Sequence, residues 1–80
     1  MERNVILEQV NEIFKDTLDN EDLVIKEETR APDVAEWDSL THIQLVVAIE
    51  KHFKIRFTSK EIQSWDNVGE MLNCIQQKGI

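Results

Sequence analysis

Ser39 is the residue of this sequence best placed for covalent chemistry. It follows Asp38 where an apolar helical pattern begins, and a serine at the first position of a helix holds its hydroxyl beside free backbone N–H groups. Those groups and the positive end of the helix dipole suit a phosphate. From these residues alone, a cap that only ends a loop is the more common outcome. Both interpretations of Ser39 stay open at this point.

Three other side chains could carry chemistry, namely His42, His52 and Cys74. The histidines are ten residues apart on one predicted helix, where they point in different directions, and no cysteine or histidine stands at metal-ligand spacing. Cys74 lies in an apolar pattern without a basic neighbour, which predicts a small buried side chain rather than a nucleophile. The acids of residues 16–22 lack the glycine and the spacing of a calcium loop. We therefore predict no metal site.

Two long apolar patterns predict the helices that position Ser39. Residues 3–17 place apolar side chains at helical spacing with charged residues between them. Residues 39–53 form the second pattern, with either Asp38 or Ser39 as its N-cap. Residues 45–49 are apolar on every side, so a buried strand is the alternative, but the length of the whole pattern favours a helix. We expect this helix to lie centrally, with little solvated surface.

Two capping boxes predict shorter helices in the last third of the chain. Thr58 with Glu61, and Asn67 with Glu70, have the types and spacing at which each side chain satisfies the other's backbone N–H. The first box predicts a short helix over residues 59–64. The second opens a final helix whose apolar residues recur at i, i+3, i+4 and i+7, namely Val68, Met71, Leu72 and Ile75. With only two glycines and one proline, the sequence predicts an all-α fold, a four-helix bundle with a short third helix.

A long acidic loop joins the first two predicted helices. A connection of about twenty residues is unusual in a small domain unless it has a task, and here the task predicted is to deliver the start of the second helix to the surface. Five apolar residues are expected to pin the loop to the core, namely Leu23, Val24, Ile25, Val34 and Trp37.

Composition limits the classes of function. The 80 residues suffice for one domain, with 41% hydrophobic and 31% charged residues. The net charge of -7 resides in residues 16–38, which hold nine acids and two basic residues, whereas residues 51–60 hold four basic residues and no acid. This balance argues against a nucleic-acid partner and favours basic protein surfaces. The longest apolar run has five residues, so we predict no membrane insertion and a cytoplasmic location.

The surroundings of Ser39 resemble the acyl and peptidyl carrier protein family. The run that carries the resemblance is Glu36-Trp37-Asp38-Ser39-Leu40-Thr41-His42-Ile43-Gln44-Leu45. It looks like the Asp-Ser-Leu attachment motif that opens the second helix of these carriers. The helix before it, the acidic loop, the short third helix and the start of the fourth at residues 65–68 extend the similarity to nearly the whole chain.

This resemblance implies a function for the chain as one carrier domain over residues 1–80. Ser39 Oγ would take 4'-phosphopantetheine covalently from coenzyme A through a separate phosphopantetheinyl transferase, and Asp38 and Leu40 would support that attachment. The thiol of the arm would bear acyl groups as thioesters, loaded by an acyl- or aminoacyl-activating ligase and used by synthase or transferase enzymes. The chain itself would catalyse nothing and is expected to be a monomer.

The same resemblance implies a partner surface along the second helix. Leu40, Ile43 and Val47 would make the apolar contacts, and Glu50 would add an acidic one. Four residues differ from carriers of fatty-acid synthesis, which place acids at the positions of Thr41, Gln44 and Lys51 and a small residue at that of Trp37. The implied pathway is fatty-acid-like, polyketide or another specialised assembly.

Three alternatives are kept. One is an aminoacyl or peptidyl carrier of a specialised pathway. Another is a helical interaction module that binds partners through its acidic loop and its basic residues 51–60 without any covalent group. The last is a phosphotransfer domain built on His42, which would carry an acid-labile phosphate.

Overall fold

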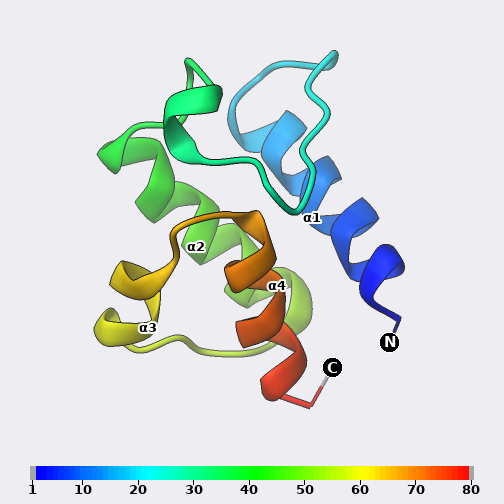
Figure 1. Cartoon of the computed structure of the whole chain (residues 1–80), viewed down its shortest axis with the longest axis vertical. Helices are drawn as coiled ribbons and strands as arrows, with labels where there is room; N and C mark the ends of the chain where they lie inside the picture. Colours follow the sequence, from blue (N-terminus) through cyan, green and yellow to red (C-terminus); the bar gives the residue numbers. More distant parts are fainter. Residues whose placement is uncertain (1, 80) are drawn as a thin grey trace.

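The structure is a computed structural model that describes residues 2–79 as four α-helices joined by loops (Figure 1). The helices are α1 (Arg3–Thr17), α2 (Ser39–Phe53), α3 (Ser59–Ser64) and α4 (Val68–Gln77). One turn of 3-10 helix, η1 (Ala31–Asp33), was not predicted. Over residues 2–79 no strand occurs, and none of the helices has the length and apolar character needed to cross a membrane. The predicted all-α fold and the predicted bounds of the first three helices are confirmed.

Three helices share one hydrophobic core. α1 packs against α2 and α4, and each of the three turns an apolar stripe inward. The large side chains without exposed surface are Ile6, Val10, Phe14, Leu45, Ile49, Val68, Met71, Leu72 and Ile75. Burying each such side chain contributes about 1.5–3 kcal/mol. Because Leu45 and Ile49 are among them, the face of α2 that bears these two residues is held against the core.

The outer face of α2 corrects one expectation. We predicted little solvated surface for this helix, but Leu40, Ile43 and Val47 are exposed. The reason is that α2 is buried along a single stripe, which Leu45, Ile49 and Phe53 occupy in the core cluster. Apolar residues outside that stripe have no neighbouring element to cover them.

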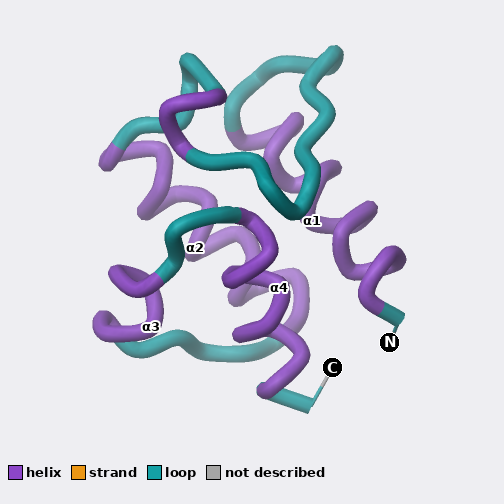
Figure 2. Tube along the Cα trace, viewed as in Figure 1, coloured by secondary structure: helices purple, strands orange, loops and turns teal. Residues whose placement is uncertain are grey.

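The loop of residues 18–38 leads from the end of α1, past the start of α4, to the start of α2, and it contains η1 (Figure 2). Ile25, Val34 and Trp37 are buried as predicted, and Leu23 is partly buried against the core. Val24 was predicted wrongly, because its side chain is 72% exposed. The Asn11 side chain accepts a hydrogen bond from Ile25 N (2.7 Å) and donates one to Leu23 O (3.4 Å). Since side chains alternate along an extended segment, fixing the two neighbours inward turns Val24 outward.

The loop also meets the beginning of α4 through its backbone. The first N–H groups of α4 donate to loop carbonyls, Val68 N to Thr29 O (2.9 Å) and Gly69 N to Glu27 O (2.8 Å). These are N–H groups that a helix cannot satisfy internally. Arg3 joins the same place, since its guanidinium contacts the Glu27 carboxylate (2.9 Å) and Gly69 O (2.9 Å). These contacts hold the middle of the loop against the start of α4.

The capping boxes were predicted with partial success. The Thr58 and Glu61 side chains each accept the other's backbone N–H, at 3.1 and 2.8 Å, as predicted. Asn67 caps α4 by accepting from Glu70 N (2.9 Å). The Glu70 carboxylate accepts instead from Asp66 N. The second capping box is therefore incomplete, because the Glu70 carboxylate bonds to the N–H of Asp66 and not to that of Asn67.

Candidate functional site

Asp38 is the N-cap of α2, which resolves the choice between Asp38 and Ser39. Its Oδ1 accepts hydrogen bonds from Leu40 N (3.0 Å) and Thr41 N (2.9 Å), and Thr41 Oγ1 accepts one from Asp38 N (2.8 Å). The backbone hydrogen bond from Thr41 is the main cause that lowers the pKa of Asp38 below its usual value. An ionised carboxylate thus stands at the start of the helix.

Ser39 is the first residue of α2 and is exposed. Because Asp38 does the capping, the Ser39 hydroxyl has no structural task there. No hydrogen bond engages this hydroxyl within the part of the chain that the structure describes. Its oxygen is therefore accessible to a reagent from solvent.

An aromatic contact fixes the residues around Ser39. Trp37 Nε1 donates to His42 Nδ1 (3.1 Å), and the two rings are stacked with their centroids 6.0 Å apart. Trp37 also meets the edge of Phe14 in the core, with centroids 4.9 Å apart. This arrangement ties the end of the loop to α2 and to α1. Sequence reasoning missed it, although a tryptophan five residues before a histidine across a helix start was a usable signal.

His42 has a structural role in this arrangement. Its Nδ1 accepts the Trp37 hydrogen bond, so this nitrogen is engaged, and its ring lies 5.9 Å from that of Trp65. His52 lies at the other end of α2, where Nε2 is 2.7 Å from Gln9 Oε1. The two histidines have different surroundings, as predicted, and the Trp37 hydrogen bond engages Nδ1 of His42.

Cys74 is buried, as predicted. Its thiol donates to Glu61 Oε2 (3.2 Å). Burial is the main cause that raises the pKa of Cys74, and the neighbouring Glu61 adds to it. A thiol in this state is a poor nucleophile. Over residues 2–79 no group of three or more acids, histidines and cysteines is placed to hold a metal ion.

An exposed apolar stripe runs along α2 from the end that bears Ser39. It consists of Leu40, Ile43 and Val47, which are 66%, 62% and 42% exposed. Their spacing of three and four residues puts them on one face of the helix. Glu50, predicted as the acidic contact of the same surface, is half-buried, and its Oε2 accepts a hydrogen bond from Phe57 N (2.8 Å). In this structure Glu50 holds the loop that follows α2.

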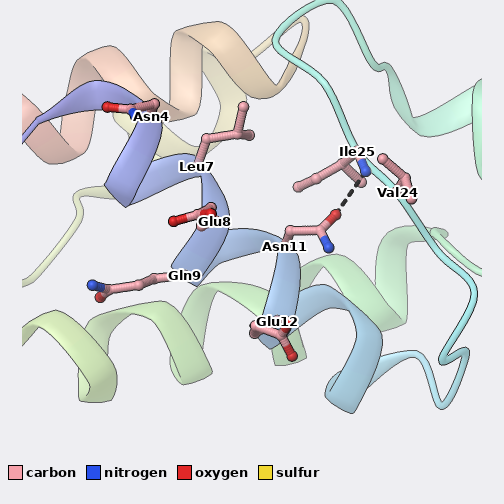
Figure 3. Close-up of a pocket in the computed structure, with 8 residues that line it drawn as sticks. All are labelled: Asn4, Leu7, Glu8, Gln9, Asn11, Glu12, Val24 and Ile25. Atoms are coloured by element: carbon pink, nitrogen blue, oxygen red, sulfur yellow. Dashed lines mark hydrogen bonds between the residues drawn. The ribbon is translucent and has the colours of Figure 1, made fainter.

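A hollow of about 670 Å³ lies elsewhere, between α1 and the segment that contains Val24 (Figure 3). Its lining includes the apolar residues Leu7, Val24 and Ile25 and the acids Glu8 and Glu12. Figure 1 draws the segment of residues 20–26 and the start of α2 on opposite sides of the molecule. The largest hollow described is therefore separate from Ser39.

An accessible serine hydroxyl at the head of an exposed apolar face is the arrangement expected of a protein that carries a covalently attached group. It would fit phosphopantetheine, because the phosphate would stand at the first turn of α2 and the arm would extend into solvent. The class defined by fold and site is thus that of small helical carrier proteins.

Comparison with known proteins agrees with this class. The family model described as phosphopantetheine attachment site matches residues 8–75. An acyl carrier protein of Clostridium acetobutylicum is 31% identical over 72 residues, which cover 90% of this chain and 94% of that protein. The solution NMR structure of a holo acyl carrier protein from Geobacter metallireducens superimposes with a TM-score of 0.84 and 38% identity, over 90% of this chain and 83% of the other.

The chain belongs to the phosphopantetheine attachment site family. The predicted prosthetic group, phosphopantetheine, and the predicted function as an acyl carrier protein are confirmed by the family match and by the two relatives. The non-covalent interaction module is the less supported alternative.

Proposed function

We propose that Ser39 Oγ is the atom to which phosphopantetheine is attached. In this reaction a bond forms between Ser39 Oγ and the phosphorus that bears the pantetheine half of coenzyme A. The pyrophosphate P–O bond breaks, and the nucleotide half of coenzyme A leaves with its electron pair. The proton of Ser39 Oγ passes to a base of the transferase, because among residues 2–79 no histidine or carboxylate accepts a hydrogen bond from that hydroxyl.

The observation that carries the proposal is the exposure of Ser39 at the head of the apolar stripe of α2. The chain contains a useful comparison in Ser59, which is also an exposed first helical residue directly after an N-cap. Ser59 is followed by Lys60 and lies on a helix of only six residues. A transferase that needs the apolar stripe would therefore select Ser39.

The neighbouring residues receive distinct roles. Asp38 caps the first turn of α2, so that Ser39 is not needed for capping. It also adds a negative charge beside the attachment point, which suits a metal-bound phosphate in the transferase. Leu40, Ile43 and Val47 contact partner enzymes. Glu50 contributes to this surface indirectly, because its hydrogen bond with Phe57 N positions the loop after α2. When bound, the arm supplies a thiol that holds acyl groups as thioesters.

The chain on this proposal is one carrier domain that catalyses nothing and is served by other enzymes. These are a phosphopantetheinyl transferase, a ligase that loads the arm, and synthases or transferases that use the cargo. The pathway proposed is fatty-acid-like, polyketide or another specialised assembly in the cytoplasm. The differences at Thr41, Gln44 and Lys51 from fatty-acid carriers support a specialised one.

Mass spectrometry of the intact protein tests the attachment. The purified chain is incubated with coenzyme A, Mg²⁺ and a transferase of broad specificity. We expect the mass to rise by one phosphopantetheine in the parent and in Ser59→Ala, and to stay unchanged in Ser39→Ala. Both variants should keep the helical circular dichroism spectrum, since each replaced serine is exposed. Modification of Ser39→Ala, or an unmodified parent, would overturn the proposal.

A further inference from the structure

The exposed stripe of α2 continues into cations at its far end. Lys51 follows Val47 by four residues, so it lies on the same helical face as Leu40, Ile43 and Val47. Lys54 and Arg56 come directly after the helix and are exposed. Together with Val47 and Ile55 these three cations border a hollow of about 460 Å³. The surface thus changes from apolar to basic about 18 Å along the helix from Ser39.

None of these three cations forms an ion pair with another of the residues that the structure describes. The ion pairs among residues 2–79 engage four other basic residues, namely Arg3, Lys15, Arg30 and Lys78. Glu50 is the one acid that lines the hollow, and one of its oxygens is bound to Phe57 N. In a chain with sixteen acids and nine basic residues, a group of unpaired cations is open to an external carboxylate. Exposed charges of this kind guide association and fix the orientation of a partner.

The other end of the same face is acidic. Glu36 and Asp38 precede Ser39 in the sequence and are exposed, whereas between Ser39 and Ile49 the helix carries no acid. The face is therefore negative near the attachment point, apolar in the middle and positive beyond Val47. A partner that covers all of it must carry the opposite order of charges. Such a face admits one orientation of the partner and disfavours the reverse, which would place like charges together.

We propose that α2 docks partner enzymes that present an apolar patch and, beyond it, acidic side chains that meet Lys51, Lys54 and Arg56. The proposal rests on the attachment at Ser39 for the nature of the occupant, a partner enzyme. The acidic chemistry follows from the cations alone.

Two designed peptides test the charge requirement. Both are helical with the same leucine face, and one carries glutamates at the flanking positions while the other carries lysines. Each is titrated into the isotope-labelled holo protein, and backbone amide shifts are followed by NMR. We expect the acidic peptide to bind more tightly, to shift amides of residues 40–56, and to weaken as salt is raised. Equal or tighter binding of the basic peptide would overturn the proposal.

A matched pair of charge reversals separates the local cations from the net charge. Lys51→Glu with Arg56→Glu should weaken the acidic peptide about tenfold, since two exposed ion pairs of up to about 1 kcal/mol each are lost. Lys26→Glu with Arg30→Glu makes the same change in net charge on the loop of residues 18–38 and should alter affinity by about twofold or less. Equal losses in the two double variants would overturn the proposal. So would binding to anionic lipid vesicles without binding to the acidic peptide.

The titration is repeated with Ser39→Ala, which lacks the arm. If this variant binds the acidic peptide while the parent never gains the arm, the docking proposal stands and the attachment proposal fails. If the parent gains the arm but binds neither peptide, the attachment proposal stands and the docking proposal fails.

Discussion

Replacing Lys54 by glycine should make the protein more stable, although it removes a side chain from the surface proposed for docking. Lys54 ends α2 in the left-handed conformation, with φ 57° and ψ 48°. Its N–H and that of Ile55 both donate to Glu50 O, so the helix end depends on this conformation. A residue with a Cβ atom is strained there, and helices usually place glycine at such a position.

The size of the effect follows from two opposing terms. The left-handed conformation costs a residue with a Cβ about 1–2 kcal/mol, and glycine adopts it without that cost. Glycine also gives the unfolded chain more freedom, which offsets about 0.4–1 kcal/mol. The expected net gain is about 1 kcal/mol. For a domain of this size that corresponds to a rise of about 4–8 °C in Tm.

Thermal unfolding followed by circular dichroism measures this rise, with Lys54→Ala as the control. Alanine removes the charge but keeps the Cβ, so Lys54→Ala should not share the gain in Tm. Both variants should bind the acidic peptide more weakly than the parent does, because both lack the ammonium group. If Lys54→Gly does not unfold at a higher temperature than Lys54→Ala, the reasoning about strain at this helix end is refuted.

Two further changes test the contacts that hold the last helix. Gly69→Ala should lower the free energy of unfolding by about 1 kcal/mol in urea titrations, because the new Cβ would lie 3.1 Å from Glu27 O, a carbonyl already bound to Gly69 N. Glu61 has a pKa lowered to about 2, mainly by the backbone N–H of Thr58 and then by Lys78. Its stabilising contribution is present above pH 4.5 and is lost as the pH falls toward 2. Glu61→Gln should therefore lose less stability over that interval than the parent, as measured by urea midpoints.

The helices could be predicted because their signals are local. The apolar spacing of residues 3–17 and 39–53 and the box of Thr58 with Glu61 specify elements from neighbours within a few positions. The start of α2 at Ser39 was predictable for the same reason, because Asp38 and the apolar run after it stand side by side in the sequence. The candidate site was thus located, while its cap was ambiguous between two good N-cap residues.

What could not be predicted depends on contacts between distant residues. Val24 is as apolar as its neighbours Leu23 and Ile25, but the hydrogen bonds between the Asn11 side chain and the backbone of those neighbours turn Val24 toward solvent. The same holds for the carbonyls of Glu27 and Thr29, which receive the first N–H groups of α4. From the sequence, Glu50 is indistinguishable from a surface acid. Its hydrogen bond with Phe57 N forms only because the loop after α2 turns back toward the helix. A linear pattern carries none of this information.

The residues on the two faces of α2 are apolar for different physical reasons. Leu45 and Ile49 are fully buried against α1, which accounts for their apolar character by folding alone. Leu40 and Ile43 are more than 60% exposed, so replacing them by polar residues would remove little buried area from the core. Folding therefore gives no reason for leucine and isoleucine at these positions. The docking that we propose supplies a reason: their place between Ser39 and the cations Lys51, Lys54 and Arg56, which form no ion pair among residues 2–79, would set both the position and the orientation in which a partner meets the carrier.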